Sequence, residues 1–191
     1  MSRGLGDVYK RQILEREVPP TEKNIETSKK GQYRIKDNFL AFWFRFVYPM
    51  RSFIESDHPE IAMTKLKTGF IPNHVGYVYE DICRQKMWEL NAQGKLPFLF
   101  DRVGRWWGGK DTEIDIVAID TTDRSKIIFG ECKFHQNVPM QLSELHQLKE
   151  KAAVVPWGNA NRDEYFALFC ISGYSEDLQQ LAQEDSHLLL M

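Results

Sequence analysis

The stretch EIDIVAIDTTDRSKIIFGECKF, residues 113–134, decides the fold. Its two apolar runs, EIDIVAI and KIIFGECKF, are separated by DTTDRS, whose Asp, Thr and Ser side chains favour a turn. Side chains alternate faces along a strand, so Phe129, Glu131 and Lys133 share one face and Cys132 lies on the other. The pattern predicts two neighbouring strands that are buried along most of their length and charged at one end.

The pattern of helices and strands around this stretch extends from residue 73 to the end of the chain. The expected elements, in order, are helix 73–91, strands 96–107, 113–119 and 126–134, helix 141–154, strand 164–171, helix 175–184 and a final LLLM run. Three meandering strands followed by a crossover helix and further strands are typical of an α/β fold, a mixed sheet flanked by helices.

The first part of the chain reads differently. Residues 13–18 and 32–36 are short strand-like runs joined by a Pro- and Lys-rich connection, which predicts a β-hairpin with a long loop. Asp37 is placed to cap an aromatic helix over 39–48, which we expect Pro49 to end. Because that helix is apolar nearly all round, we expect it to be buried, as a clamp between the hairpin and the later domain.

Composition excludes several classes of protein. The chain has 191 residues, 42% hydrophobic and 27% charged, which is typical of a globular protein rather than a disordered or membrane chain. Its net charge of −2 excludes a uniformly basic nucleic-acid wrapper but leaves a local basic patch open. The three cysteines form neither a disulfide framework nor a zinc motif, and no apolar run is long enough to cross a membrane. We therefore expect a cytoplasmic protein.

The charged end of the two strands is the candidate catalytic site. Ionised groups entering a buried strand are costly unless they are paired or bound to a cation, which makes Asp115, Glu131 and Lys133 a candidate Mg²⁺ or Mn²⁺ site. The carboxylates of Asp115 and Glu131 would bind the metal, and the lysine would stabilise developing negative charge. Glu80, at the edge of the apolar stripe of helix 73–91, is the candidate third acid. The alternatives are a structural salt bridge at a strand end and, for Glu80, a surface acid.

A basic and aromatic stretch precedes the acidic strand. Arg102, Arg105, Trp106 and Lys110 combine cations with a ring that could stack on bases, which predicts contact with nucleic acid. The alternative is that the tryptophan fills the core and the arginines pair with nearby acids. Both interpretations remain open at the level of sequence.

The order of these residues resembles a known superfamily. A helix acid, Glu80, then a strand acid, Asp115, then Glu131-Cys132-Lys133 on the next strand, is similar to the PD-(D/E)XK nucleases. Longer segments resemble domain-of-unknown-function family 234, the C-terminal domain of archaeal-type AAA ATPases. These segments are YRIKDNFLAFWFRFVYP (33–49), GYVYEDICRQ (76–85), FDRVGRWWGGKDTEIDIVAID (100–120) and FGECKF (129–134). The resemblance implies a restriction-endonuclease-like domain preceded by the remnant of a winged helix.

The expected domains follow from this resemblance and from the N-terminal sequence, in which DVYKRQ is similar to the translated end of a transposon-based sequencing adapter. They are a non-native scar (1–12), a winged-helix wing hairpin (13–37), linker helices (38–72) and a nuclease-like domain (73–191). The chain holds no GxxxxGK[ST] phosphate loop and hence no ATP site, so the resemblance places the ATPase core in N-terminal sequence missing from this chain.

The two acids and the lysine on adjacent strands favour Mg²⁺-dependent hydrolysis of DNA phosphodiesters as the function. The alternative is a catalytically inactive nuclease fold that binds DNA or protein for its ATPase.

Overall fold

The computed structural model describes residues 13–109, 111–134, 136–159 and 161–191. The expectations for residues 1–12 and for Lys110 lie outside the described residues. The fold comprises two compact units, one formed by residues 13–17 and 31–78 and the other by residues 18–30 and 79–191. Each unit is described by itself.

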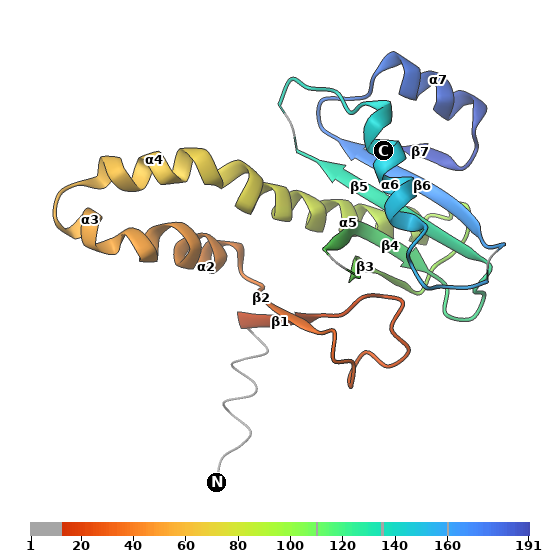
Figure 1. Cartoon of the computed structure of the whole chain (residues 1–191), viewed down its shortest axis with the longest axis horizontal. Helices are drawn as coiled ribbons and strands as arrows, with labels where there is room; N and C mark the ends of the chain where they lie inside the picture. The colour runs from red at the N-terminus through yellow and green to blue at the C-terminus, as the bar shows by residue number, and fades with distance from the viewer. Residues whose placement is uncertain (1–12, 110, 135, 160) are drawn as a thin grey trace, which may run out of the picture. The chain divides into compact units, whose positions relative to one another are not determined.

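The second unit is built on a mixed five-stranded sheet (Figure 1). Its strands are β3 (Arg102–Gly108), β4 (Thr112–Ile119), β5 (Lys126–Lys133), β6 (Asp163–Cys170) and β7 (Leu188–Leu190). They lie side by side in chain order, with antiparallel pairing from β3 to β5 and parallel pairing from β5 to β7. The predicted mixed sheet, with its meander and crossover, is confirmed.

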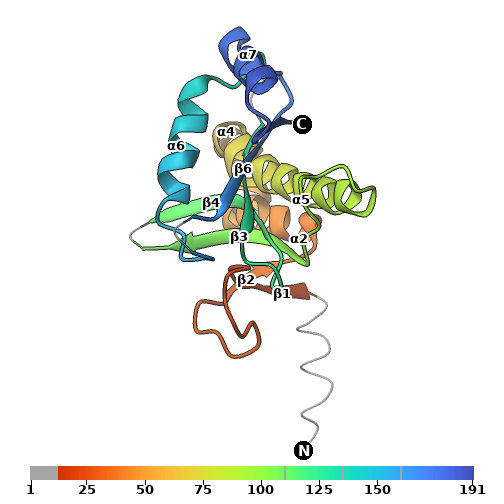
Figure 2. The same cartoon turned by 90° about the vertical axis from the view of Figure 1, so that its right-hand side faces the viewer.

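Helices cover both faces of this sheet, and Figure 2 shows α5 and α6 on opposite sides of it. The helices are α5 (Gly76–Ala92, in this unit from Tyr79), α6 (Leu142–Ala152) and α7 (Glu176–Glu184). Along β5, Ile127 and Phe129 pack in the core beneath α6 and α7, whereas Ile128 and Cys132 pack beneath α5. The alternation predicted for this strand is therefore confirmed.

Strand β3 begins later than its sequence suggests. The apolar run from residue 96 predicts a strand, but the ladder starts at Arg102. Before it, the side chain of Asn91 accepts the backbone N–H of Phe100 and donates to its carbonyl oxygen, both at 3.0 Å. The backbone at Phe100 is thus satisfied by the end of α5 rather than by a neighbouring strand, which corrects the predicted boundary.

The predicted hairpin is present. Strand β1 (Leu14–Glu17) pairs antiparallel with β2 (Gln32–Ile35) in the first unit, and the connection 18–30 belongs to the second unit. That connection is anchored to β3, because Arg102 donates to the carbonyl oxygens of Pro20 and Glu22.

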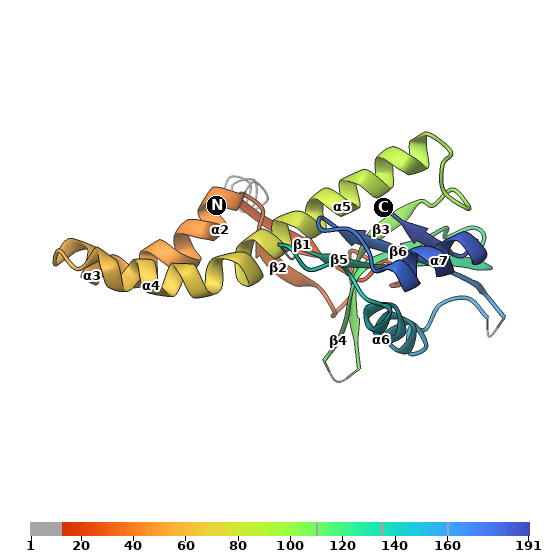
Figure 3. The ribbon, with the colours of Figure 1, turned by 90° about the horizontal axis from the view of Figure 1, so that it is seen from above.

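The first unit also contains a run of short helical segments, which Figure 3 shows from above. They are α2 (Asn38–Phe42), the π-helix η1 (Trp43–Val47), the 3₁₀ turn η2 (Tyr48–Met50), α3 (Arg51–Glu55), α4 (Pro59–Phe70) and the π-helix η3 (Ile71–Val75). Asp37 caps α2 as predicted, accepting the Leu40 N–H at 2.8 Å. Pro49 does not end the helical path, because it lies in the first turn of η2, where a missing N–H is tolerated.

The aromatic segment is not buried, contrary to the sequence prediction. Phe42 and Phe46 contact Phe70 and His74, but no residue from Asn38 to Met50 is buried in this structure. Phe39 is 65% exposed. An all-round apolar helix can leave one side in solvent when its partners cover only the other. The predicted clamp role stays a prediction.

None of the helices within the described ranges combines the length and apolar character needed to cross a lipid bilayer.

Candidate functional site

A β-bulge on β4 shapes the candidate site. Gly104 of β3 pairs with Val117, and Trp106 pairs with Ile114, so two steps on β3 oppose three on β4. Ile114 and Val117 consequently pack in the same core, although regular alternation would place them on opposite faces. The extra residue falls in the Asp115 region, and bulges commonly redirect a side chain beside a functional site.

Asp115 lies where the β4–β5 ladder stops. The paired register ends at Ile116 opposite Gly130. One residue further along, the Oδ2 atom of Asp115 accepts the backbone N–H of Cys132 at 2.8 Å. The carboxylate thus takes the position of a ladder carbonyl, which fixes it beside the Glu131–Lys133 end of β5.

Glu131 is a buried carboxylate with a cation on each oxygen. Its side chain is 8% exposed, and Lys133 Nζ donates to Oε1 at 2.7 Å. Lys151, which comes from α6, donates to Oε2 at 3.2 Å. Two ammonium groups therefore offset the cost of burying this carboxylate.

Glu80 joins the site through arginines. Its Oε2 accepts Arg105 Nη2 at 3.2 Å and lies 3.6 Å from Arg84 Nη1. Arg84 also pairs with Asp81 and donates to the backbone carbonyl of Asp115 at 3.0 Å. The structure thus brings Asp115, Glu131 and Lys133 together directly, and Glu80 reaches them through Arg84.

Burial and neighbouring acids raise the pKa values of Asp115 and Glu80. Burial and then the neighbouring Glu131 raise the pKa of Asp115 to about 6. Burial and then Asp115 raise the pKa of Glu80 to about 7, although Arg105 and Arg84 oppose the shift. Burial alone would lower the pKa of Lys133, but the charge of Glu131 and the hydrogen bond to it raise that pKa above its ordinary value. The carboxylates thus repel one another, and a further cation would relieve that repulsion.

The donor set fits a hard divalent cation with an incomplete protein shell. Asp115 and Glu131 offer carboxylate oxygens, the ligands that Mg²⁺ prefers, and Mg²⁺ usually keeps several waters beside one or two carboxylates. Within the described ranges, no group of three or more His, Cys, Asp or Glu side chains is placed to hold a metal ion. The described residues therefore form no closed structural metal centre, and Asp115 and Glu131 are the two carboxylates that could contact a cation here.

The predicted nucleic-acid residues lie apart from one another. Arg102 binds the loop carbonyls of residues 20 and 22, and Arg105 pairs with Glu80. Trp106 is 2% exposed, and its indole N–H donates to the Thr21 hydroxyl. Trp106 therefore presents no ring face for stacking on a base in this structure, because the sheet and loop 18–30 enclose it. This corrects the surface role predicted for Trp106, and Lys110 lies outside the described residues.

Sequence reasoning missed two cations of the site, although the sequence carries a signal for each. Lys151 follows the buried Leu148 by three positions, so it flanks the buried stripe of its helix. Arg84 follows Glu80 by four positions, which is the spacing of a helical ion pair. Both lie next to buried residues, where a charge needs a partner.

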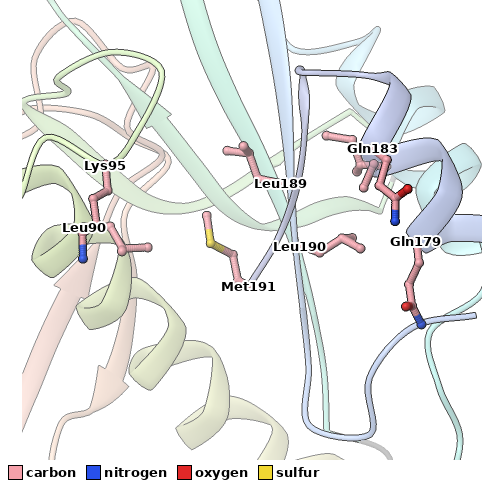
Figure 4. Close-up of a pocket in the computed structure, with 9 residues that line it drawn as sticks. Leu90, Lys95, Gln179, Gln183, Leu189, Leu190 and Met191 are labelled. Atoms are coloured by element: carbon pink, nitrogen blue, oxygen red, sulfur yellow. The ribbon is translucent and has the colours of Figure 1, made fainter.

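A separate hollow of about 600 Å³ lies elsewhere in the second unit (Figure 4). It is lined by Leu90, Lys95, Gln179, Ala182, Gln183 and residues 188–191. Its lining is mostly aliphatic and includes no carboxylate side chain, so it lacks the donors that a hydrolytic metal site needs.

Comparisons with known proteins bear on the same region. A family model, DUF234, which describes archaeal and bacterial proteins of unknown function, matches residues 43–152. The chain belongs to the DUF234 family. The matched range contains Glu80, Asp115, Glu131, Lys133 and Lys151, so the whole candidate site lies inside the family domain.

The chain is also 35% identical, over 158 residues, to an uncharacterized protein of Methanocaldococcus jannaschii. This alignment covers 82% of the chain and 34% of that protein, so the chain spans about a third of its relative's length. No solved structure matches the chain.

Proposed function

We propose that the second unit is a Mg²⁺- or Mn²⁺-dependent domain that hydrolyses phosphodiester bonds in DNA, with a restriction-endonuclease-like fold of the PD-(D/E)XK superfamily. The observation that carries the proposal is the convergence of Asp115, Glu131 and Lys133 at one end of β4 and β5. An acid on each of two adjacent strands and a lysine two residues after the second acid are the groups that this reaction uses.

The residues of the candidate site would have different roles in this reaction. Asp115 and Glu131 would hold the cation, which, when bound, polarises the phosphate and lowers the pKa of a water. Lys133 already lies 2.7 Å from Glu131 and carries a charge that stabilises the anionic transition state. Glu80 and its two arginines position the residues that α5 brings to the site, because Arg84 also donates a hydrogen bond to the backbone carbonyl of Asp115.

The test is cleavage of DNA by the purified protein with Mg²⁺ or Mn²⁺. Asp115→Asn should lower the cleavage rate by at least about 100-fold, the scale of losing a principal catalytic group. Glu113→Gln is the matched control, because Glu113 is an exposed acid two residues earlier on the same strand. Equal loss in both variants, or no loss in Asp115→Asn, would contradict the assignment.

A second candidate function rests on a specific observation. The described acids of the site already have protein partners, since Glu131 contacts two lysines and Glu80 contacts two arginines. Such internal pairing also suits a catalytically inactive nuclease fold that binds DNA or protein. This candidate predicts no metal-dependent cleavage but retention of DNA that weakens steeply with salt.

The wider context is a further part of the proposal. We propose that the domain works as the C-terminal part of a longer protein with an ATPase core. The resemblance to archaeal-type ATPases supports it, as does the relative that is about three times as long as the aligned region. The uninterrupted gene upstream of Ile13 would test it, because a GxxxxGK[ST] motif is expected there.

A further inference from the structure

Lys151 is the part of the site that the family resemblance does not supply. It projects from α6 and occupies the second oxygen of Glu131, at 3.2 Å, while Lys133 occupies the first at 2.7 Å. Both oxygens of a carboxylate that would hold the cation are therefore bonded to ammonium groups. A divalent cation approaching Glu131 must share an oxygen with one of these lysines or replace it.

The two lysines are not held equally. Asp115 attracts both lysines, but Lys133 makes the shorter contact to Glu131 and is also attracted by Glu144. The two lysine side chains are about equally exposed, 32% for Lys151 and 29% for Lys133, so either ammonium could move into water. The length of the contact distinguishes them, because Lys151 lies 3.2 Å from Glu131 and Lys133 lies 2.7 Å from it. Lys151 is therefore the partner that is easier to displace.

We propose that Lys151 is a displaceable positioning residue: it neutralises and orients Glu131 in the cation-free protein and gives up that oxygen when a divalent cation binds. The inference rests on the proposed function, because it takes Glu131 as a ligand of the cation. It adds that the domain's affinity for cations is set by a competing lysine on α6.

The direct test follows the side-chain ammonium signals of the wild-type protein by NMR during a titration with Mg²⁺, a diamagnetic cation. Lys151→Arg and Lys133→Arg variants assign the two signals. The signal of Lys151 should shift and lose its protection from solvent exchange as Mg²⁺ binds, while that of Lys133 should remain protected. A Lys151 signal that stays unchanged at saturating Mg²⁺ overturns the proposal.

Calorimetric titration with Mn²⁺ supplies an independent measurement. Lys151→Met should bind Mn²⁺ at least about fivefold more tightly than wild type, because a positive charge that competes for Glu131 is removed. Lys149→Met is the matched control, since Lys149 is an exposed lysine on the same helix whose ammonium lies over the ring of Phe166. Equal affinities in the two variants overturn the inference and leave the proposed function intact.

The remaining outcomes of the Mn²⁺ titration also distinguish the proposed role of Lys151 from the proposed function of the domain. Binding of Mn²⁺ by Lys151→Met alone, with none by wild type, would show that Lys151 blocks the cation; it would contradict both the displacement of the lysine and a working metal site in wild type. Failure of wild type and Lys151→Met alike to bind Mn²⁺ overturns both. Thermal melting of each variant shows whether it is folded, and the NMR titration of wild type needs no variant whose folding is in doubt.

Discussion

Two neighbouring regions of one sheet carry charged residues, but the charged side chains come together in one region and lie apart in the other. At the end of β4 and β5, Asp115, Glu131 and Lys133 converge, and Lys151 joins them from α6. On β3, a stretch just as rich in charged and aromatic residues spreads its side chains apart. Its members bind loop carbonyls, pair with Glu80 and fill the core.

This difference shows that the backbone, as much as the type of residue, decides whether charged side chains come together. The bulge on β4 and the end of its ladder aim Asp115 at the amide of Cys132, which brings the acid to the next strand. On β3, the connection 18–30 lies against the strand and takes up Arg102 and Trp106. We therefore interpret the first region as a site and the second as a structural anchor, and each prediction below tests that contrast.

Trp106→Ala should have the largest effect on stability, a loss of about 3–5 kcal/mol in the free energy of unfolding, because it leaves a cavity in the core. Urea denaturation measures it, and Trp107→Ala, which removes a less buried ring of the same strand, should cost less. A small loss of stability together with weakened DNA binding would show that Trp106 stacks on bases. It would contradict the interpretation of β3 as a structural anchor.

Lys133→Met should lower metal-dependent DNA cleavage by at least about 100-fold, equivalent to about 2.7 kcal/mol of transition-state stabilisation. Arg102→Met should change cleavage by less than about threefold and should instead speed proteolysis within residues 18–30, whose carbonyls it releases. Initial rates and limited proteolysis provide the two readings. A larger cleavage defect in Arg102→Met than in Lys133→Met would reverse the assignment of the two regions.

Arg105 belongs to both regions, since it lies on β3 and contacts Glu80 of the site. A double-mutant cycle of Arg105→Met and Glu80→Gln should give a coupling energy of about 1–3 kcal/mol, because each single change leaves a mostly buried charge without this partner. Denaturation of the four proteins measures it. Additive effects would show that the contact at 3.2 Å contributes nothing to stability.

The smallest expected effect is a change in the pH dependence of stability. The folded-state pKa of Asp115, about 6, lies above its ordinary value of 3.8, so the folded protein binds this proton more tightly than the unfolded chain. The stability contributed by this group is present below about pH 4 and is lost as pH rises through about 6. Between those values the Tm of wild type should fall more than that of Asp115→Asn, and parallel curves would contradict the raised pKa.

Much of the fold could be predicted from local pattern. The alternation in KIIFGECKF gives the faces of β5, and the turn residues after Ile119 mark the β4–β5 connection, because regular ladders impose a period of two. The aromatic helix predicted over 39–48 is not buried as expected. All-round apolarity does not say which side a partner will cover, and π- and 3₁₀-helical turns change the helical period.

The acids and one lysine of the candidate site could be proposed from the sequence, but their contacts and two further cations, Lys151 and Arg84, could not. The identities of Asp115, Glu131 and Lys133 follow from charges entering buried strands. The bulge on β4 could not be predicted, because no glycine or proline lies in its own strand between Ile114 and Val117. Lys151 could not be assigned to Glu131 either, since the packing of α6 on the sheet is a long-range outcome that brings residues 20 positions apart into contact.

The most direct test of the central claim is to locate Mn²⁺ on the protein through the paramagnetic broadening of its backbone amide signals. The account predicts that substoichiometric Mn²⁺ broadens the amides of residues 114–116 and 131–133 first, and that Asp115→Asn abolishes this selective broadening. Broadening centred elsewhere on the chain, or an Asp115→Asn spectrum that responds as wild type does, would contradict it.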